Sequence, residues 1–281
     1  MNRENFAFIN DTFVPRERAH LHVDDLAVQR GYGVFDFFRL HEGKPVFLDD
    51  HLDRFEFSAS RMRLPFGRTR DQLKQILAEL IEQNGMPNSG VRLTLTGGYA
   101  ADGYTIVTPN LVIVQRAISV NPQLAMGIRL TTFEHQRQLC DVKTIDYLMA
   151  IWLQPLLAER GADDVLYHQG GVISECPRSN AYIVTPGGRL ATPGRNILKG
   201  VNRKHVLEVA RGQMLVEERD VHLDEIRDAK EAFITSTTKG VVPVVAVDAR
   251  PIGDGQPGEA TRWLRDALAE RARTVGIGSG R

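Results

Sequence analysis

The stretch CDVKTIDYLMAIW, residues 140–152, places a lysine directly before an apolar pattern. The apolar residues recur at helical spacing and predict an amphipathic helix from Ile145 onward; they are Ile145, Leu148, Met149 and Trp152. Lys143 precedes this pattern. A lysine in that position is either an ordinary surface residue or a nucleophile held in a pocket. Residues elsewhere in the chain have to decide between these two interpretations.

Composition and charge exclude several classes of protein. The chain has 281 residues, of which 42% are hydrophobic and 25% charged, as in ordinary globular proteins. Lys+Arg and Asp+Glu both number 35, so the net charge of zero gives no support to a nucleic acid or an anionic membrane as the main partner. No apolar run approaches the roughly 20 residues that a membrane helix needs.

The cysteines and the start of the chain bear on its compartment. The two cysteines, Cys140 and Cys176, do not suggest a disulfide framework. The first residues, MNRENFAFIND, lack the apolar run of a secretory signal. We therefore expect a protein of the reducing cytoplasm.

Turn residues and periodicity predict an α+β fold in two unequal lobes. In the first lobe they predict hairpins over 6–15 and 34–48, a helix capped by Asp49 or Asp50, a helix over 70–84 ended by Gly85, and strands over 91–98 and 110–118. In the second they predict strands over 127–135, 163–169, 171–175, 230–238 and 241–252, a hairpin around 186–188, and helices over 202–211 and 259–273. The predicted domains are 1–118 and 126–281, joined by a linker at 119–125.

Two segments have the character of anion sites. In ILKGVNRKHVLEVAR, residues 197–211, Gly200 precedes a predicted helix whose first N–H groups would point at a ligand. The ordinary alternative is a helix capped by Asn202 that binds nothing. In FITSTTKG, residues 233–240, hydroxyl groups gather at a strand end, where they suit a phosphate or simply form a polar turn.

Two charged side chains could complete such a site. Arg54, in HLDRF, offers a guanidinium fork to an anion, or is an exposed helix arginine. Glu175, in GVISECPRSNAYIV, ends a predicted strand and could pair with a protonated ring nitrogen, or is an ordinary strand-end glutamate. None of these residues is decisive by itself.

Together the motifs form an ordered set: HLDR, KTIDYL, SECPRSN, ILKGVNR and STTKG. In this order and approximate spacing the chain resembles the class IV aminotransferases, which are pyridoxal-phosphate enzymes of fold type IV. The resemblance runs over nearly the whole chain. It implies a small N-terminal α/β domain, a larger C-terminal α/β-barrel-like domain that binds the cofactor, and a homodimer. No metal is expected.

By this resemblance Lys143 is the lysine that forms the Schiff base with pyridoxal 5'-phosphate and then moves the substrate proton. Glu175 resembles the partner of the ring nitrogen, and Arg54 the phosphate-binding arginine. The remaining residues that the resemblance assigns to the cofactor are Tyr147, Gly200, Val201, Asn202, Ser236, Thr237 and Thr238. The family often has threonine where this chain has Asn202.

The substrate carboxylate is where the chain departs from the best-known D-amino acid aminotransferases. Those enzymes hold the carboxylate with an arginine and a histidine on a small-domain loop and with a tyrosine from the early strand. The corresponding loop here, TGGYAADGYTIVTPN, residues 96–110, has neither an arginine nor a histidine, and Phe35 stands at the tyrosine position. Arg30 and Arg178 are the alternative candidates for binding carboxylates.

The second half of the chain looks most similar to D-amino acid aminotransferases. The resulting hypothesis is a transaminase that moves an amino group from a D-amino acid to a keto acid such as 2-oxoglutarate or pyruvate. Four alternatives stay open: a branched-chain or broad L-amino acid aminotransferase, an (R)-amine transaminase, an aminodeoxychorismate lyase, and a non-catalytic binding protein on the same scaffold.

Overall fold

The computed structural model describes residues 5–119 and 121–274. Within them the chain divides into two compact units, and the second unit begins after Ser119. The described part of the first unit holds 5–119, 142–146 and 273–274, and that of the second holds 121–141 and 147–272. The predicted second domain thus differs from the second unit, because 142–146 packs with the first. Residue 120 of the predicted linker and the ends 1–4 and 275–281 of the predicted domains lie outside the described residues.

The first unit is built on a sheet with the strand order β2-β1-β6-β5-β3-β4 in the described residues. Its strands are β1 (Phe6–Ile9), β2 (Thr12–Pro15), β3 (Gly33–His41), β4 (Lys44–Pro45), β5 (Ser89–Thr96) and β6 (Leu111–Ala117). Its α-helices are α1 (Leu26–Arg30), α2 (Leu48–Arg61) and α3 (Arg70–Asn84), and η1 (Arg16–Arg18) is a 3₁₀ turn. The predicted hairpins and the helix ended by Gly85 are confirmed.

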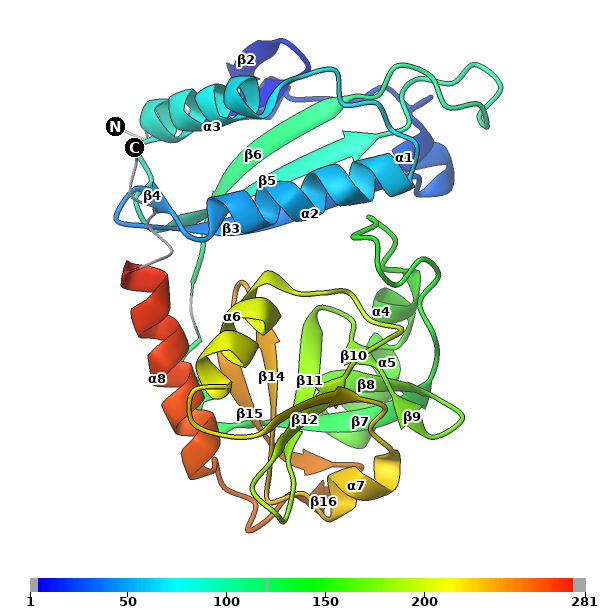
Figure 1. Cartoon of the computed structure of the whole chain (residues 1–281). Helices are drawn as coiled ribbons and strands as arrows, with labels where there is room; N and C mark the ends of the chain where they lie inside the picture. The colour runs from blue at the N-terminus through cyan, green and yellow to red at the C-terminus, as the bar shows by residue number, and fades with distance from the viewer. Residues whose placement is uncertain (1–4, 120, 275–281) are drawn as a thin grey trace. The chain divides into compact units, whose positions relative to one another are not determined.

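Helices α2 and α3 cover one face of this sheet (Figure 1) and bury their apolar stripes in a common core. Leu52 and Phe55 of α2 meet Leu77 of α3 there, each at most 1% exposed. The predicted capping of α2 is wrong, because the helix begins one residue before Asp49, after Phe47 in the left-handed region (φ 54°). The acidic residues lie in the first turn instead, where the helix dipole favours negative charge.

The second unit has a curled sheet (Figure 1) with the order β13-β12-β11-β14-β15-β7-β8-β9 in the described residues, while β10 pairs with β11 and β16 with β15. Its strands are β7 (Ile128–Glu134), β8 (Asp164–Gln169), β9 (Val172–Ile173), β10 (Glu175–Cys176), β11 (Ser179–Val184), β12 (Leu190–Pro193), β13 (Val216–Arg219), β14 (Glu231–Ser236), β15 (Gly240–Val247) and β16 (Arg250–Pro251). Apolar side chains such as Ile183 and Ile234 fill its interior. This architecture confirms the predicted α+β class.

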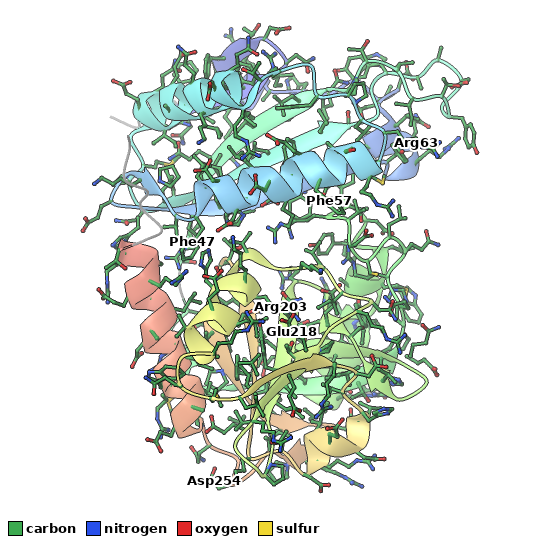
Figure 2. All side chains as sticks on the ribbon, viewed as in Figure 1. Phe47, Phe57, Arg63, Arg203, Glu218 and Asp254 are labelled. Carbon is green, nitrogen blue, oxygen red and sulfur yellow. The ribbon has the colours of Figure 1, made fainter. Side chains whose placement is uncertain are left out.

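The helices of this unit are α4 (Leu148–Trp152), α5 (Gln154–Arg160), α6 (Val201–Ala210), α7 (Leu223–Arg227) and α8 (Glu259–Thr274), with a 3₁₀ turn η2 (Pro122–Met126). The last two residues of α8, 273–274, belong to the first unit. Helix α6 packs against β14, and Arg271 of α8 donates to His205 of α6. Arg203 of α6 points toward Glu218 of β13 (Figure 2), and the two groups lie 3.0 Å apart. These contacts fix α6, whose first turn was predicted to face an anion.

The prediction that opened the sequence analysis is partly wrong. The helix begins at Leu148 and not at Ile145, and Leu148, Ile151 and Trp152 are all at least 64% exposed in this chain. The apolar pattern therefore does not form a buried stripe. Residues 142–146 are irregular instead, and Thr144 makes an isolated antiparallel bridge with Val34 at the start of β3.

No helix among residues 5–119 and 121–274 combines the length and apolarity required to span a bilayer.

Candidate active site

The backbone of Lys143 is fixed by hydrogen bonds within the first unit. Its carbonyl accepts from the N–H of Phe35 at 2.9 Å, and its own N–H donates to Ser58 Oγ of α2 at 3.1 Å. Two residues on, Ile145 donates to the carbonyl of Gly33 at 3.1 Å. A Cβ on Gly33 would lie 2.8 Å from the carbonyl oxygen of Leu95, so only glycine permits this close packing. The lysine therefore extends from an ordered strand edge.

The lysine side chain lies over an aromatic ring that a second cation also contacts. Lys143 Nζ is 4.5 Å from the centre of the Phe35 ring, and the guanidinium carbon of Arg92 is 4.0 Å from the same centre. The negative face of an aromatic ring attracts such cations. The Phe35 ring thus contacts the Lys143 amine directly. A tyrosine at this position would add a hydroxyl group, which Phe35 lacks. Sequence analysis identified Phe35 but missed Arg92.

Arg54 does not project freely into solvent but is held by a buried carboxylate. Its Nε and Nη2 donate to the two oxygens of Asp36, each at 2.8 Å, and His51 Nδ1 lies 2.7 Å from the same carboxylate. Burial alone would raise the pKa of Asp36, but Arg54 and His51 hold that pKa well below its usual range. The fork fixes the plane of the guanidinium.

The signal for this cluster was present in the sequence. Asp36 falls on the apolar side of β3, between Val34 and Phe38, where a charge needs a partner. His51 and Arg54 are three residues apart on α2 and therefore share a helix face. Burial has the largest effect on His51 and lowers its pKa, although the nearby Asp36 carboxylate opposes that effect. The predicted arginine thus belongs to a three-residue cluster.

Glu175, in the second unit, is also buried and also held on both oxygens. Arg137 Nη1 donates to Oε1 at 2.8 Å, and the N–H of Leu198 donates to Oε2 at 3.1 Å. Only 6% of the Glu175 side chain and 16% of the Arg137 side chain are exposed. Burial alone would lower the pKa of Arg137, but the Glu175 charge raises it. Sequence analysis missed Arg137, because it lies in an irregular segment without a periodic pattern.

The start of α6 has the geometry of an anion-binding turn. Gly200 precedes the helix in an extended conformation, and no side chain caps the first turn. The alternative of a helix capped by Asn202 is wrong, because that side chain donates to the carbonyl of Ser236 at 2.8 Å. A Cβ on Gly200 would lie 2.2 Å from Asn180 Oδ1, so the close approach requires glycine.

The same hydrogen bond brings the two predicted anion motifs together. Ser236 ends β14, and its hydroxyl accepts from the N–H of Lys239 at 3.3 Å. Thr237 and Thr238 lie between them in the turn that leads to β15, and Thr238 is exposed. Hydroxyl groups of this turn and the uncapped amides of α6 therefore gather in one part of the second unit, which is the donor set that a phosphate requires.

The remaining predicted residues are less constrained. Arg30 ends α1 and is exposed, with Nη1 donating to the carbonyl of Gln29 at 2.8 Å. Arg178 is exposed in the turn between β10 and β11. Tyr147 is half-buried directly before α4. Arg30 belongs to the first unit, and Arg178 and Tyr147 belong to the second.

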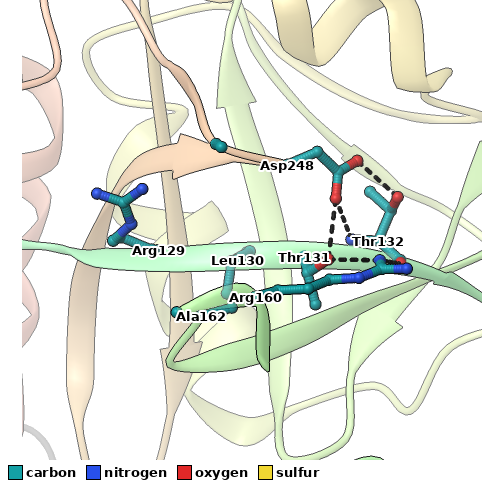
Figure 3. A pocket seen from close by; sticks show the side chains of 9 residues that line it. Arg129, Leu130, Thr131, Thr132, Arg160, Ala162 and Asp248 are labelled. Atoms are coloured by element: carbon teal, nitrogen blue, oxygen red, sulfur yellow. Dashed lines mark hydrogen bonds between the residues drawn. The ribbon is translucent and has the colours of Figure 1, made fainter. Parts of the chain in front are cut away.

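A pocket of about 420 Å³ in the second unit lies apart from all these residues. It is lined by Arg129, Leu130, Thr131, Thr132, Arg160, Gly161, Ala162, Asp248 and Ala249. Asp248 accepts hydrogen bonds from Thr131 and Thr132, and Arg160 donates to Thr131 (Figure 3). These contacts join the β15–β16 turn to β7. None of the predicted site residues lines it.

The fold of the whole chain matches that of known aminotransferases. A branched-chain aminotransferase from the thermophilic archaeon Thermoproteus uzoniensis is 22% identical with a TM-score of 0.87, over 96% of this chain and 95% of that one. A hypothetical aminotransferase from Mycobacterium tuberculosis is 21% identical with a TM-score of 0.82, over 96% and 99% of the two chains. The chain therefore has the fold type IV architecture of these enzymes.

The sequence comparisons specify the family. A profile described as Amino-transferase class IV matches residues 33–247, and the chain belongs to this family. It is an aminotransferase, and pyridoxal 5'-phosphate is its cofactor. Proteins named D-alanine aminotransferase are similar to it: the one from Staphylococcus haemolyticus is 29% identical over 93% of this chain and 95% of its own length. The one from Bacillus licheniformis is 29% identical over 95% and 98%.

Proposed function

We propose that this aminotransferase moves the amino group of a D-amino acid to a keto acid such as 2-oxoglutarate or pyruvate. The observation that carries the proposal is the similarity to D-alanine aminotransferases over nearly the full length of both chains. The branched-chain enzymes share the fold at 24% identity or less, and a likeness at that level supports the fold without the substrate.

The donor groups of the second unit fit a phosphate: the uncapped amides of Val201 and Asn202 and the hydroxyls of Ser236, Thr237 and Thr238 would hold it. By the family resemblance Arg54, whose guanidinium Asp36 orients within the first unit, would add a charge. Glu175 would accept a hydrogen bond from the ring nitrogen, and Tyr147 would flank the ring. When bound, the cofactor supplies an electron sink for the charge that develops at the substrate Cα.

Lys143 would supply the amine that attaches the cofactor and would then move a proton at the substrate Cα. Its backbone hydrogen bonds to Phe35 and Ser58 keep the Cα of Lys143 in place while the amine acts first as the attachment point and then as the base. A fixed base close to the transferred proton lowers the barrier because little reorganisation is needed. The Phe35 ring beneath the amine excludes water from one side of it.

The attachment is tested by absorbance. The purified protein with added cofactor is expected to show the visible band of a lysine-bound pyridoxal phosphate, and Lys143→Ala is expected to abolish it. Lys74→Ala, which removes a partly exposed lysine paired with Asp49, is the matched control and should keep the band. A band that persists in Lys143→Ala would refute the role of Lys143.

The substrate class is tested with a panel. D-alanine, L-leucine and an (R)-amine without a carboxylate are each offered with 2-oxoglutarate, and the keto or ketone product is measured. D-alanine is expected to react fastest. Faster reaction of L-leucine or of the amine would favour the corresponding alternative, and pyruvate elimination from aminodeoxychorismate would favour the lyase.

Arg30 and Arg178 are proposed to bind the substrate carboxylates, because the loop that carries the carboxylate-binding residues in other enzymes has no arginine or histidine here. Arg178→Ala is expected to raise KM for the keto acid about tenfold without loss of the cofactor band. Arg227→Ala, an exposed arginine paired with Asp224, is the control. An unchanged KM would show that Arg178 does not bind the keto acid.

We also propose a homodimer working in the reducing cytoplasm. The exposed apolar residues of α4 support association, because an unpaired chain rarely leaves Leu148, Ile151 and Trp152 in water together. Cys140 and Cys176 are both free thiols. Sedimentation velocity of the cofactor-loaded protein checks the dimer, and a monomer at micromolar concentration would contradict it.

A further inference from the structure

Asp25 is a buried carboxylate that none of the proposed chemistry uses. Its side chain is inaccessible to solvent, and it accepts hydrogen bonds from Ala27 N at 2.7 Å and from Thr96 Oγ1 and Asn110 Nδ2, both at 2.8 Å. These donors are neutral. A carboxylate buried among neutral donors is costly unless its hydrogen bonds are well made. The arrangement therefore indicates that a specific geometry is being held.

The donors come from two elements that Asp25 joins. Ala27 lies in the first turn of α1, which Asp25 caps. Thr96 ends β5 and Asn110 directly precedes β6, so these two residues form the neck of the loop over residues 97–110. A single carboxylate thus closes the neck of the β5–β6 loop and attaches it to the start of α1.

Backbone contacts extend this attachment along α1. Leu26 N donates to the carbonyl of Gly98 at 3.0 Å, and Gly97 N donates to the carbonyl of Tyr32 at 3.3 Å. A Cβ on Gly97 would lie 2.7 Å from Leu26 Cδ1 and 3.0 Å from Leu26 Cβ, so the loop packs closely against the helix here. The loop is therefore bound to both ends of the helix.

The last residue of α1 is Arg30. The helix ends at Gly31 in the left-handed region (φ 66°), and Arg30 Nη2 lies 3.5 Å from the position that a Cβ on Gly103, in the loop, would occupy. The Arg30 guanidinium thus lies against the middle of the loop, and Asp25 holds the neck of the same loop through Thr96 and Asn110. Asp25 and Arg30 are joined through one short helix and one loop.

We propose that Asp25 is a positioning residue for Arg30. It fastens α1 and the β5–β6 loop into a single arm, and this arm presents the Arg30 guanidinium to the carboxylate of the substrate. The inference rests on the proposed role of Arg30 and extends it, because it gives the loop a function. The loop itself has no cationic side chain that would bind the carboxylate. Its function would be to support α1, which carries Arg30.

The test is a double-mutant cycle with Asp25→Asn and Arg30→Ala, measured on the cofactor-loaded enzyme. An asparagine has only one acceptor oxygen, so it cannot accept both from Ala27 N and from Thr96 and Asn110, and one side of the attachment is lost. Asp25→Asn is expected to raise KM for D-alanine and for 2-oxoglutarate about tenfold, with kcat and cofactor affinity little changed. In the Arg30→Ala background the same substitution should have no further effect on KM.

A structural readout accompanies the kinetics. Asp25→Asn is expected to accelerate hydrogen–deuterium exchange in peptides that cover α1 and residues 97–110 together. Asn84→Ala is the matched control, because Asn84 is a buried amide of the same unit that bonds the backbone of Phe6 and touches neither element. It should lower stability without raising KM or accelerating exchange in the arm.

If Asp25→Asn does not fold, Thr96→Val removes one donor with little change of shape, and its KM should rise about threefold. Equal effects of Asp25→Asn in both backgrounds, or unchanged KM values, would overturn the inference, as would an Arg30→Ala enzyme with unchanged KM. The proposed function is judged separately, by whether the wild type accepts D-alanine at all. The cycle can be run on any carboxylate substrate that the wild type uses.

Discussion

Each unit contains a buried carboxylate paired with an arginine, and the two pairs are built differently. In the first unit Arg54 donates two hydrogen bonds to the Asp36 carboxylate, and His51 Nδ1 is also within hydrogen-bond distance of it. In the second unit Arg137 reaches one oxygen of Glu175, and a backbone N–H holds the other. A fork fixes the plane of a guanidinium, whereas donors on both oxygens fix the plane of a carboxylate.

The difference shows which member of each pair is oriented. The Asp36 pair orients an arginine, and the Glu175 pair orients a carboxylate. These are the members that sequence analysis assigned to the cofactor, whereas Asp36 and Arg137 were not recognised. The predictions below separate the oriented member from its support.

The largest effect is expected from removal of Asp36. Asp36→Ala leaves Arg54 charged and without its buried partner, which is expected to lower the free energy of unfolding by about 3–5 kcal/mol. Urea denaturation of the cofactor-free protein measures this change. Asp11→Ala removes an exposed partner of Arg68 and should cost less than about 1 kcal/mol. A similar small loss for Asp36→Ala would show that the cluster does not stabilise the fold.

The next effect is expected on catalysis. Glu175→Gln keeps the shape of the side chain but removes the charge that would face the ring nitrogen, and kcat is expected to fall about a hundredfold, or roughly 2.7 kcal/mol. Steady-state rates with D-alanine and 2-oxoglutarate measure it. Glu159→Gln, on the exposed side of α5, is the control. An unchanged kcat with the cofactor fully bound would exclude the proposed role of Glu175.

A direct comparison of the two arginines is expected to give a smaller effect. Arg54→Lys cannot reproduce the fork and should raise the Kd of the cofactor about tenfold. Arg137→Lys can still reach Glu175 Oε1 with an ammonium group, so its Kd should rise only about threefold. Absorbance titration of the cofactor measures both. A larger rise in Kd for Arg137→Lys than for Arg54→Lys would show that the orientation of Arg54 by Asp36 does not matter for binding of the cofactor.

The smallest effect concerns pH and is specific to the first pair. Burial lowers the pKa of His51 in the folded protein. A depressed folded pKa gives stability that is present above the unfolded value near 6.5 and lost as pH falls toward the folded value. Urea unfolding at pH 8 and pH 5.5 should show this loss, and His51→Gln should reduce it. If His51→Gln loses as much unfolding free energy between pH 8 and pH 5.5 as the wild type does, the loss comes from other groups.

Local signals accounted for much of the fold. The turn at Asn10, in the left-handed region (φ 55°), and the helix end at Gly85 follow from residue types that favour such geometry. Short helices such as α1, α5 and α7 were missed, because their stability comes from packing and hydrogen bonds to distant residues. The Asp25 contacts to Thr96 and Asn110 are an example.

The Lys143 segment shows why local patterns fail at a site. Apolar residues at helical spacing predicted a helix beginning beside the lysine, but the first of them, Ile145, pairs with Gly33, more than a hundred residues earlier. Periodicity within a window contains no information about such a partner. The motif order nevertheless identified Lys143, Arg54 and Glu175 as candidates. Asp36 and His51 had a signal in their spacing that was not recognised, whereas Arg137, in an irregular segment, required coordinates.

The pairing of segment 142–146 with the start of β3 has a consequence for synthesis of the chain on the ribosome. When residue 119 has been made, the first unit has most of its sheet, but the segment that pairs with the first part of β3 does not yet exist. Val142 also fills the core of that unit. The nascent unit therefore carries an unpaired strand edge and an incomplete core until residue 146 emerges.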